Sequence, residues 1–333
     1  MLEKERINLQ LFAENLNVNT TTQTGTGRDL SAEDKIFYDK TLIRLAGPNI
    51  IHDQFGQKRN IPKNGGKTIE FRKFSPLGKA TTPLTEGVTP EGQSLDVSKV
   101  EATVKQYGGY VTISDKLDMT AIDPVVTETI SLISDQAAKT LDTIERDILC
   151  TGTNVQYAEG QVESRNALVG GKADGNHYLT VDAIRKAVRS LKRMNAETIN
   201  GSYVGIIHPD AAYDLMSDPK WINVKTYSDP EGIYQGEIGK IENVRFVETS
   251  EAKIFEKAGA EGVDVYATLI IGENAYGTTD IAGGGLQHIV KQLGSAGTAD
   301  PLNQRATAGW KATKTAVRLV EPYMVRIETA SSF

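Results

Sequence analysis

The residues of this chain best suited to nucleophilic chemistry are its single cysteine, Cys150, and the histidines His177 and His208. A thiol beside an imidazole base is a common catalytic pair. Nothing in the sequence brings these residues together, and Cys150 closes an apolar helical stretch, which favours a small buried thiol. His208 precedes Pro209, a pair typical of a strand-to-helix turn. We therefore predict that none of the three is catalytic.

Other motifs of catalysis or ligand binding are equally weak. The run 283–285 is three glycines, which we interpret as a flexible turn because no complete phosphate-binding loop surrounds it. There is no Gly-x-Ser-x-Gly elbow and no His-Glu-x-x-His helix, and His52 and His288 show no ligand spacing to the other histidines. We predict no enzymatic activity, no metal and no cofactor. An α/β enzyme stays open as an alternative because residues 203–208 look like a buried strand and its turn.

The composition is that of a soluble globular protein, with 333 residues of which 39% are apolar and 24% charged. We expect no membrane span, since no apolar run approaches the ~18 residues required. Residues 1–14 do not resemble a secretion signal, which disfavours a second alternative, a surface-layer protein. The net charge of -6 argues against tight binding of polyanions. Five basic residues share one predicted helix, which we interpret as a solvated face: Arg185, Lys186, Arg189, Lys192 and Arg193.

Residues 60–105 predict a long arm with little packing of its own. Its two limbs alternate in period two, with Ile69 and Phe71 on one side of the first and Val100 and Ala102 on one side of the return. The intervening loop is interrupted by Pro76, Gly78, Pro83, Gly87, Pro90 and Gly92. Such a long loop is uncommon within a compact domain and favours a partner on another molecule.

A long amphipathic helix is predicted directly after the arm, over residues 124–149. Asp123 and Pro124 suit the cap and first position of a helix. At 1.5 Å per residue it would extend ~39 Å, longer than most helices in globular domains. Its apolar stripe has helical spacing: Val126, Ile130, Ile133, Ala137, Leu141, Ile144 and Ile148. The predicted polar face includes Asp142.

The middle of the chain predicts a compact α/β domain. A helix follows Thr180, a buried strand covers 203–207, and a second helix starts at Pro209. Strands are expected at 244–247 and 265–271. Before the arm, we expect a flexible tether at 15–27 and a helix at 31–46. After residue 283 the chain returns to extended structure, with four apolar residues alternating around Pro322: Val317, Leu319, Val325 and Ile327. The middle domain is thus predicted to be inserted between two pieces of another.

Several short motifs occur in an order that resembles one family of proteins. They are GGKTIEFR at 65–72, PLTEGVTP at 83–90, HPD at 208–210, GEIGKIENVRFVET at 236–249, DPLNQR at 300–305 and GWKA at 309–312. Together they resemble the major capsid proteins of tailed bacteriophages, most closely the branch typified by coliphage N-four. The likeness extends from about residue 29 to 328. It departs at Glu242-Asn243, where many relatives have a glycine-containing turn, although asparagine also adopts positive φ.

The resemblance implies an α+β, Hong-Kong-97-like capsid fold with a spine helix, an axial domain, an extended loop and an N-terminal arm. Mapped onto this chain, its parts are the N-terminal arm 1–28, a helical segment of the peripheral domain 29–59, the extended loop arm 60–105, the peripheral domain 106–175 with the spine helix 124–149, the axial domain 176–282, and the C-terminal return to the peripheral domain 283–333.

The resemblance also implies a function. Copies of the chain would assemble as hexamers and pentamers into an icosahedral shell around double-stranded DNA, without tight sequence-specific binding to it. Portal, scaffold and decoration proteins would be its partners, with no role for a membrane. Assembly would occur in the cytoplasm of the host bacterium, and the final location would be the virion. We expect contacts between subunits at Phe71, Arg72, Phe74, Leu84, Glu86 and Trp310.

Overall fold

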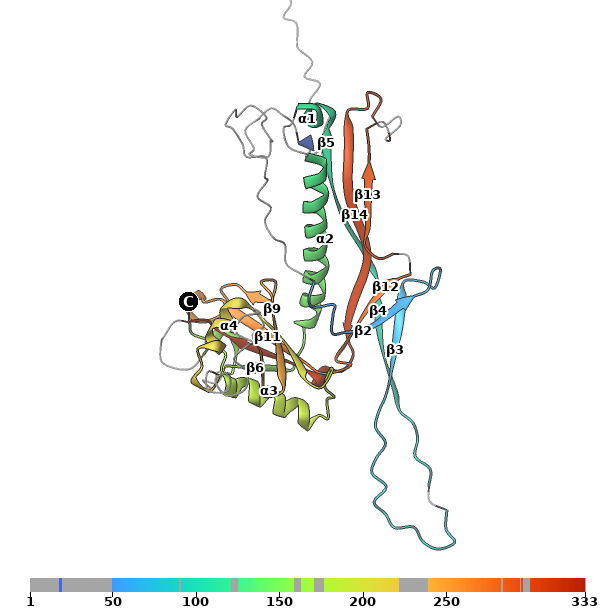
Figure 1. Cartoon of the computed structure of the whole chain (residues 1–333). Coiled ribbons are helices and arrows are strands. Elements are labelled where there is room, and N and C mark those ends of the chain that lie inside the picture. Colours follow the sequence, from blue (N-terminus) through green and yellow to red (C-terminus); the bar gives the residue numbers. More distant parts are fainter. Residues whose placement is uncertain are drawn as a thin grey trace, which may run out of the picture. The chain divides into compact units, whose positions relative to one another are not determined.

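The computed structural model describes residues 18–19, 50–89, 91–120, 125–158, 163–170, 177–221, 239–282, 284–293, 295 and 300–332. The expected helix at 31–46 and nearly all of the N-terminal arm lie outside these residues. The chain divides into two compact units (Figure 1). The first comprises Met1–Gly47, Gln106–Ala138 and Gly284–Ala312, and the second comprises Pro48–Lys105, Lys139–Gly283 and Thr313–Phe333.

The first unit is built on strands β5 (Lys105–Ser114), β13 (Gln287–Lys291) and the first part of β14 (Arg305–Arg318), with the short helix α1 (Asp115–Thr120). Strand β14 lies between β5 and β13, and β1 (Val18–Asn19) is parallel to β5. Glycine allows the close approach of β5 to β14, because a Cβ at Gly108 would lie 2.7 Å from the carbonyl oxygen of Trp310.

The long helix α2 (Val125–Leu149) confirms the predicted spine helix. The stripe residues Ile133, Ala137 and Leu141 are buried. Asp142 is also buried, although its position on the helical wheel predicted an exposed polar face. The physical reason for this difference is that Asp142 binds two backbone amides and a histidine, described below. Among the described residues, no helix combines the length and the apolar character that a membrane crossing requires.

The second unit contains a seven-stranded sheet in the order β6-β15-β11-β7-β9-β8, with β10 also paired to β11. Helices α3 (Val181–Arg193) and α4 (Pro209–Met216) accompany it, and Thr180 Oγ1 caps α3 by accepting from Ala183 N at 3.2 Å. The strands are β6 (Val155–Tyr157), β7 (Tyr203–Ile207), β8 (Lys240–Ile241), β9 (Val244–Glu248), β10 (Ile254–Phe255), β11 (Val265–Ile271) and β15 (Met324–Thr329). The predicted helix after Thr180, the buried strand 203–207 and the helix from Pro209 are confirmed.

The sheet of the second unit has an apolar layer on each face. Ile184 and Leu191 of α3 pack in one cluster with Val325 and Ile327 of β15. Leu149 at the end of α2 packs in another cluster with Met324 of β15. Because the sheet is covered on both faces, its central strands carry continuous apolar runs, such as residues 203–207.

Strand β15 differs from the expectation drawn from the sequence. The whole of 283–333 was expected to return to the domain of the spine helix, but β15 lies between β6 and β11 in the sheet of the middle domain. All six of its residues are buried. The extended structure predicted around Pro322 is confirmed, and neighbours at both edges of β15 and apolar layers on both faces bury every position. A short 3-10 turn, η6 (Glu321–Tyr323), precedes the strand.

The turn at Glu242-Asn243 joins β8 to β9 with two residues, because Ile241 pairs directly with Val244. Both turn residues have positive φ, 49° and 67°. Two positive φ values in a two-residue hairpin loop match the right-handed twist of the strands that flank it. The asparagine therefore supplies the conformation for which a glycine was expected.

Candidate functional site: an exposed arm and a buried polar cluster

The predicted arm is a hairpin of the second unit. Strands β3 (Thr68–Phe74) and β4 (Val97–Thr103) are antiparallel, and their register runs from Thr68 opposite Thr103 to Phe74 opposite Val97. Ile69 faces Ala102 and Phe71 faces Val100. The two strands confirm the extended limbs that the alternation of apolar residues predicted. Ser75 N donates to Asp96 O at 3.0 Å and closes the paired part of the hairpin.

Beyond this closure, the loop 76–95 continues away from β3 and β4 (Figure 1). Every residue that the structure describes in this loop is exposed. The exposed residues include four large apolar ones, Leu77, Leu84, Val88 and Leu95, and Leu84 is 77% exposed. Four such residues in one twenty-residue loop without packing of its own favour an interaction with another molecule.

A groove of about 560 Å³ lies at the base of the arm. Its apolar residues are Ile69, Phe71, Val100, Leu319 and Val320, and its polar residues are Gln57, Arg59, Glu70, Arg72, Lys73 and Asn274. Gln57 and Arg59 belong to β2 (Gln57–Ile61), which pairs in parallel with β12 (Tyr276–Ile281). Phe71 packs closely on β12, since a Cβ at Gly277 would lie 3.0 Å from Phe71 Cζ.

The structure places the six predicted contact residues in two different environments. Five lie on the arm: Phe71, Arg72, Phe74, Leu84 and Glu86. Phe74 is 62% exposed, whereas Phe71 is half-buried against its own body. Trp310 lies apart, on β14, and is only 4% exposed within the chain. Its indole Nε1 donates to Gln136 Oε1 at 3.2 Å. Trp310 therefore packs within its own subunit and offers almost no surface to a neighbour.

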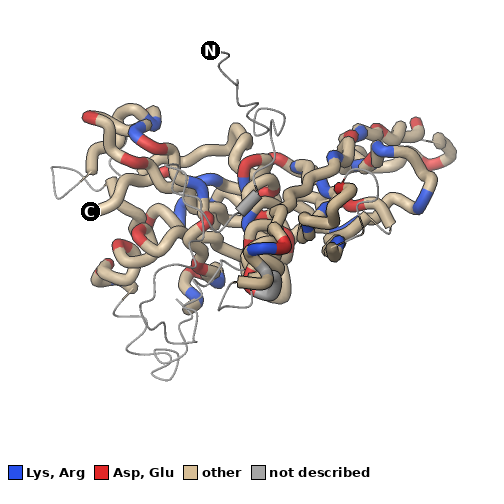
Figure 2. Tube along the Cα trace, turned by 90° about the horizontal axis from the view of Figure 1, so that it is seen from above, with Lys and Arg blue, Asp and Glu red and all other residues tan. Residues whose placement is uncertain are grey.

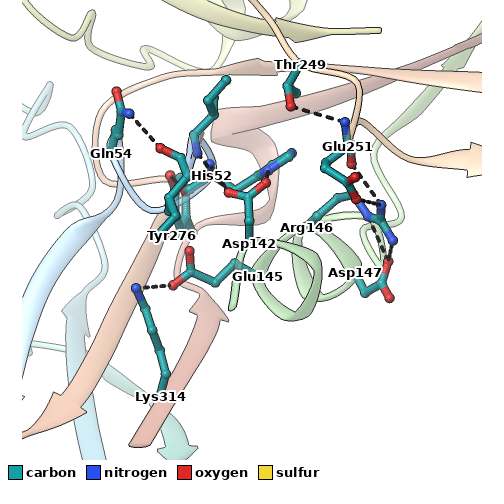
Figure 3. Close-up of polar contacts among 12 residues, drawn as sticks. His52, Gln54, Asp142, Glu145, Arg146, Asp147, Thr249, Glu251, Tyr276 and Lys314 are labelled. Carbon is teal, nitrogen blue, oxygen red and sulfur yellow. Dashed lines mark hydrogen bonds and ion pairs between the residues drawn. The ribbon is translucent and has the colours of Figure 1, made fainter. Parts of the chain in front are cut away.

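A polar cluster is buried in the second unit where α2 meets residues 51–53 (Figure 3). Asp142 Oδ1 accepts hydrogen bonds from the backbone N of Ile51 and of His52, each at 2.8 Å, and Oδ2 accepts from His52 Nδ1 at 2.7 Å. Burial opposes ionisation of Asp142, but the bonds from His52 and Ile51 outweigh it and hold the pKa below its ordinary value. The carboxylate thus fixes the segment that leads to β2.

Lys314 extends the cluster by linking two further acids. Its Nζ lies 2.8 Å from Asp53 Oδ1 and 2.9 Å from Glu145 Oε1. Glu145 is 0% exposed, and burial, together with repulsion from Asp53 and Asp142, raises its pKa to about 7 against the attraction of Lys314. For Asp53, burial is outweighed by the hydrogen bonds from Lys314 and Lys58, and the pKa is lowered.

Tyr276 completes the cluster. Its hydroxyl group donates to the carbonyl oxygen of His52, and burial raises the pKa of the phenol well above its ordinary value. The cluster therefore connects β12, the segment at 51–53, α2 and β14 through hydrogen bonds and ion pairs. Within the described residues the network is only partly satisfied, because His52 Nε2 and Glu145 Oε2 are buried without a hydrogen-bond partner. Its contacts join the segment 51–53, which leads to β2, to α2.

The three residues first considered for nucleophilic chemistry are buried or hydrogen-bonded to the backbone. Cys150 is buried, and burial raises the pKa of its thiol to about 12, which disfavours the thiolate that a nucleophile needs. His177 Nδ1 accepts from Val169 N at 2.8 Å, and His208 Nδ1 accepts from Asp210 N at 3.2 Å at the start of α4. Within the described parts of the chain, no group of three or more His, Cys, Asp or Glu side chains is arranged to hold a metal ion.

The basic residues of α3 form an exposed face, as the sequence predicted. Arg185 is engaged with acids, since its guanidinium lies 2.7 Å from Glu242 Oε1 and 3.1 Å from Asp182 Oδ1. Along the trace, Lys and Arg are interspersed with Asp and Glu (Figure 2). The pattern is that of a solvated surface with mixed charge.

Two buried acids were not identified from the sequence. Glu145 stands four residues after Leu141 and four before Leu149, so helical spacing alone places it on the buried face. The other is Glu328 of β15, which accepts from Arg165 Nε and Arg326 Nε, each at 2.7 Å. Little in the sequence indicated that Glu328 is buried, because a single acid in a strand usually lies on a face exposed to solvent.

The arm, the long helix and the inserted sheet domain define the Hong-Kong-97-like fold of tailed-phage capsid proteins. The chain is similar to the capsid of cyanophage Pam1, with a TM-score of 0.67 and 15% identity over 90% of this chain and 98% of that one. It is also similar to the capsid of cyanophage P-SCSP1u, with a TM-score of 0.66 and 15% identity over 93% and 96%. For the capsid of Ralstonia phage GP4, the values are 0.63 and 14% over 93% and 98%.

Residues 141–292 match a family model described as phage capsid protein. The match covers every strand of the seven-stranded sheet except β15, and the last third of α2. No curated protein sequence was found to match the chain. The predicted α+β capsid fold is therefore confirmed, whereas the structures, at these identities, do not distinguish one branch of tailed phages from another.

Proposed function

We propose that this chain is the major capsid protein of a tailed bacteriophage, and that its copies assemble into an icosahedral shell around double-stranded DNA. The observation that carries the proposal is the loop 76–95, in which every described residue is exposed although four are large and apolar. The capsid fold and the family match over 141–292 support it. The chain has no structural reason to expose this loop unless a neighbour covers it.

The energetics of the arm favour a large, repeated contact. Ordering each residue of a free loop costs ~1–2 kcal/mol of backbone entropy, and full burial of one large apolar side chain returns ~1.5–3 kcal/mol. The four apolar side chains therefore cannot order twenty residues by themselves. Backbone hydrogen bonds and polar contacts to a neighbour must contribute as well, which requires the arm to lie along another subunit.

The finer parts of the proposal follow the family resemblance. The chain belongs to the branch typified by coliphage N-four, and the shell is built from hexamers and pentamers. The parts of the chain are arranged as peripheral and axial domains with the boundaries given above, except that β15 (Met324–Thr329) belongs to the sheet of the middle domain. Portal, scaffold and decoration proteins join it in the host cytoplasm, and the virion is its final location. The negative net charge of -6 suits a container from which DNA must slide out. The chain acts structurally and not as an enzyme.

The test is replacement of residues 76–95 by an Asn-Gly turn, which suits a two-residue hairpin and preserves the pairing of β3 with β4. We expect a folded, soluble subunit that forms no shells, measured by circular dichroism, sedimentation and negative-stain electron microscopy. The matched control is Arg189→Ser with Lys192→Ser on the exposed face of α3, which should leave assembly intact. Closed shells of normal size from the shortened protein would refute the role of the arm.

A further inference from the structure

We propose that the tip of the arm of one copy docks into the groove at the base of the arm of a second copy. The acidic residues of the tip would face the basic residues of the groove. This inference rests on the proposed function, because both need copies that meet through the arm, and it adds the place and the chemistry of that contact.

The groove offers an apolar floor with an excess of positive charge. Among the described residues, Arg59 and Lys73 have no ion-pair partner. Glu70 is the one acid in the lining. It is already shared by two cations, since Arg72 Nε lies 2.8 Å from its Oε1 and Lys99 Nζ lies 3.0 Å from its Oε2. The groove therefore suits an occupant that is apolar and acidic.

The tip of the arm has the complementary chemistry. Val88 N donates to Thr85 O at 3.1 Å, and Gly87 has a φ of +76°, so residues 85–88 form a tight turn. Leu84 and Val88 flank this turn, with Glu86 at its corner, and both apolar side chains are largely exposed. Glu91 follows within a few residues. The turn thus presents two apolar side chains with acidic residues beside them. Because the turn is already formed in the free subunit, docking costs less ordering entropy.

The acids of the tip are unpaired within the described part of the chain. Neither Glu86 nor Glu91 has an ion-pair partner there, and Lys79 is the one basic residue in the loop 76–95. The groove and the tip thus carry opposite excess charges, each uncompensated in the subunit. Complementary charge across an interface sets its register and speeds association.

The tip of one copy cannot fill its own groove. The groove is lined by β3 and β4, and the loop leaves these strands at Ser75 and Asp96. Each limb between there and the turn has about ten residues, which extend ~30 Å at about 3.3 Å per residue. The limbs lead away from the strands (Figure 1). A tip that meets a groove must therefore meet that of a second copy, and such a contact between two different patches repeats from subunit to subunit.

Charge reversal tests the contact. In Arg59→Glu with Lys73→Glu, the groove becomes acidic, and we expect the subunit concentration needed for shell formation to rise at least tenfold by light scattering. Adding Glu86→Lys and Glu91→Lys to the same chain should return it to near the wild-type value. The matched control is Lys63→Glu with Lys67→Glu, which makes the same change of charge at exposed positions outside the groove. This control should assemble as wild type.

A disulfide trap gives an independent reading. In Arg59→Cys with Glu86→Cys, mild oxidation of assembled shells should link copies into a ladder on a denaturing gel. Buried Cys150 does not compete. Lys63→Cys with Glu86→Cys should give no ladder. The inference is overturned if the acidic groove assembles at the wild-type concentration, if the fourfold variant is not restored, or if the trap gives no ladder. If the wild-type chain itself never assembles, the proposed function fails as well.

Discussion

The buried carboxyl group of Glu145 makes a prediction about pH. Its side chain is fully buried. Burial and the nearby acids raise its pKa from an ordinary 4.5 to about 7, although the attraction of Lys314 acts in the opposite direction. The folded state therefore holds this proton more tightly than the unfolded state does. Stability from the protonated form is complete below pH 4.5 and is lost as the pH rises through 7. The interval between these values corresponds to about 3 kcal/mol.

The variant Glu145→Gln removes this dependence because glutamine does not ionise. We expect the wild type to lose about 3 kcal/mol relative to the variant between pH 4.5 and 7.5. The assay is denaturant unfolding of soluble, unassembled subunits across this range. Asp53 and Asp142 have lowered pKa values, so their contributions are lost only at lower pH, and they cancel in the comparison. Glu101→Gln, at an exposed glutamate, is the matched control.

Two results would contradict the reasoning. A flat difference between wild type and variant from pH 4.5 to 7.5 would mean that Glu145 titrates alike in both states. A variant that becomes less stable than the wild type as the pH rises would mean that the ion pair with Lys314, at 2.9 Å, outweighs the cost of burial. Infrared difference spectra provide a direct check, since a protonated carboxyl group at pH 6 should be seen in the wild type and absent from the variant.

Two further predictions concern stability. Asp142→Ala should cost about 3–5 kcal/mol, because the buried amides of Ile51 and His52 and the His52 ring lose their acceptor; denaturant unfolding measures this loss, and a loss below about 1 kcal/mol would show that water replaces the carboxylate. Gly205→Ala should cost about 1–3 kcal/mol, because the added Cβ would lie 2.7 Å from the ring of Phe246; a thermal unfolding midpoint equal to that of the wild type would show that the ring moves aside freely.

The sequence predicted the local elements of the fold well because each depends on a short-range pattern. The alternation of Ile69 and Phe71 predicted a strand there, and the three-and-four spacing of Ile133, Ala137 and Leu141 predicted α2. The helical spacing of Val181, Ile184 and Leu191 predicted α3. In each case the residues that set the structure lie within one or two turns or strand repeats of one another.

The features that the sequence did not reveal depend on residues far apart in the chain. The position of β15 is set by pairing with β11, more than fifty residues earlier. The burial of Trp310 depends on Gly108, Gly109 and Gln136, which have no local relation to it. The acceptor role of Asp142 depends on backbone amides ninety residues away. Composition and periodicity do not report such pairings.

The place of β15 in its sheet bears on the order of events during synthesis. The strand lies between β6 and β11, which are both made earlier, so a growing chain holds these two with a vacant position between them. Until β15 leaves the ribosome, the facing edges of β6 and β11 have no partner, and unpaired strand edges invite aggregation. A nascent chain therefore cannot complete this sheet until its last strand emerges, and the open edges of β6 and β11 are exposed to unwanted pairing with other chains until then.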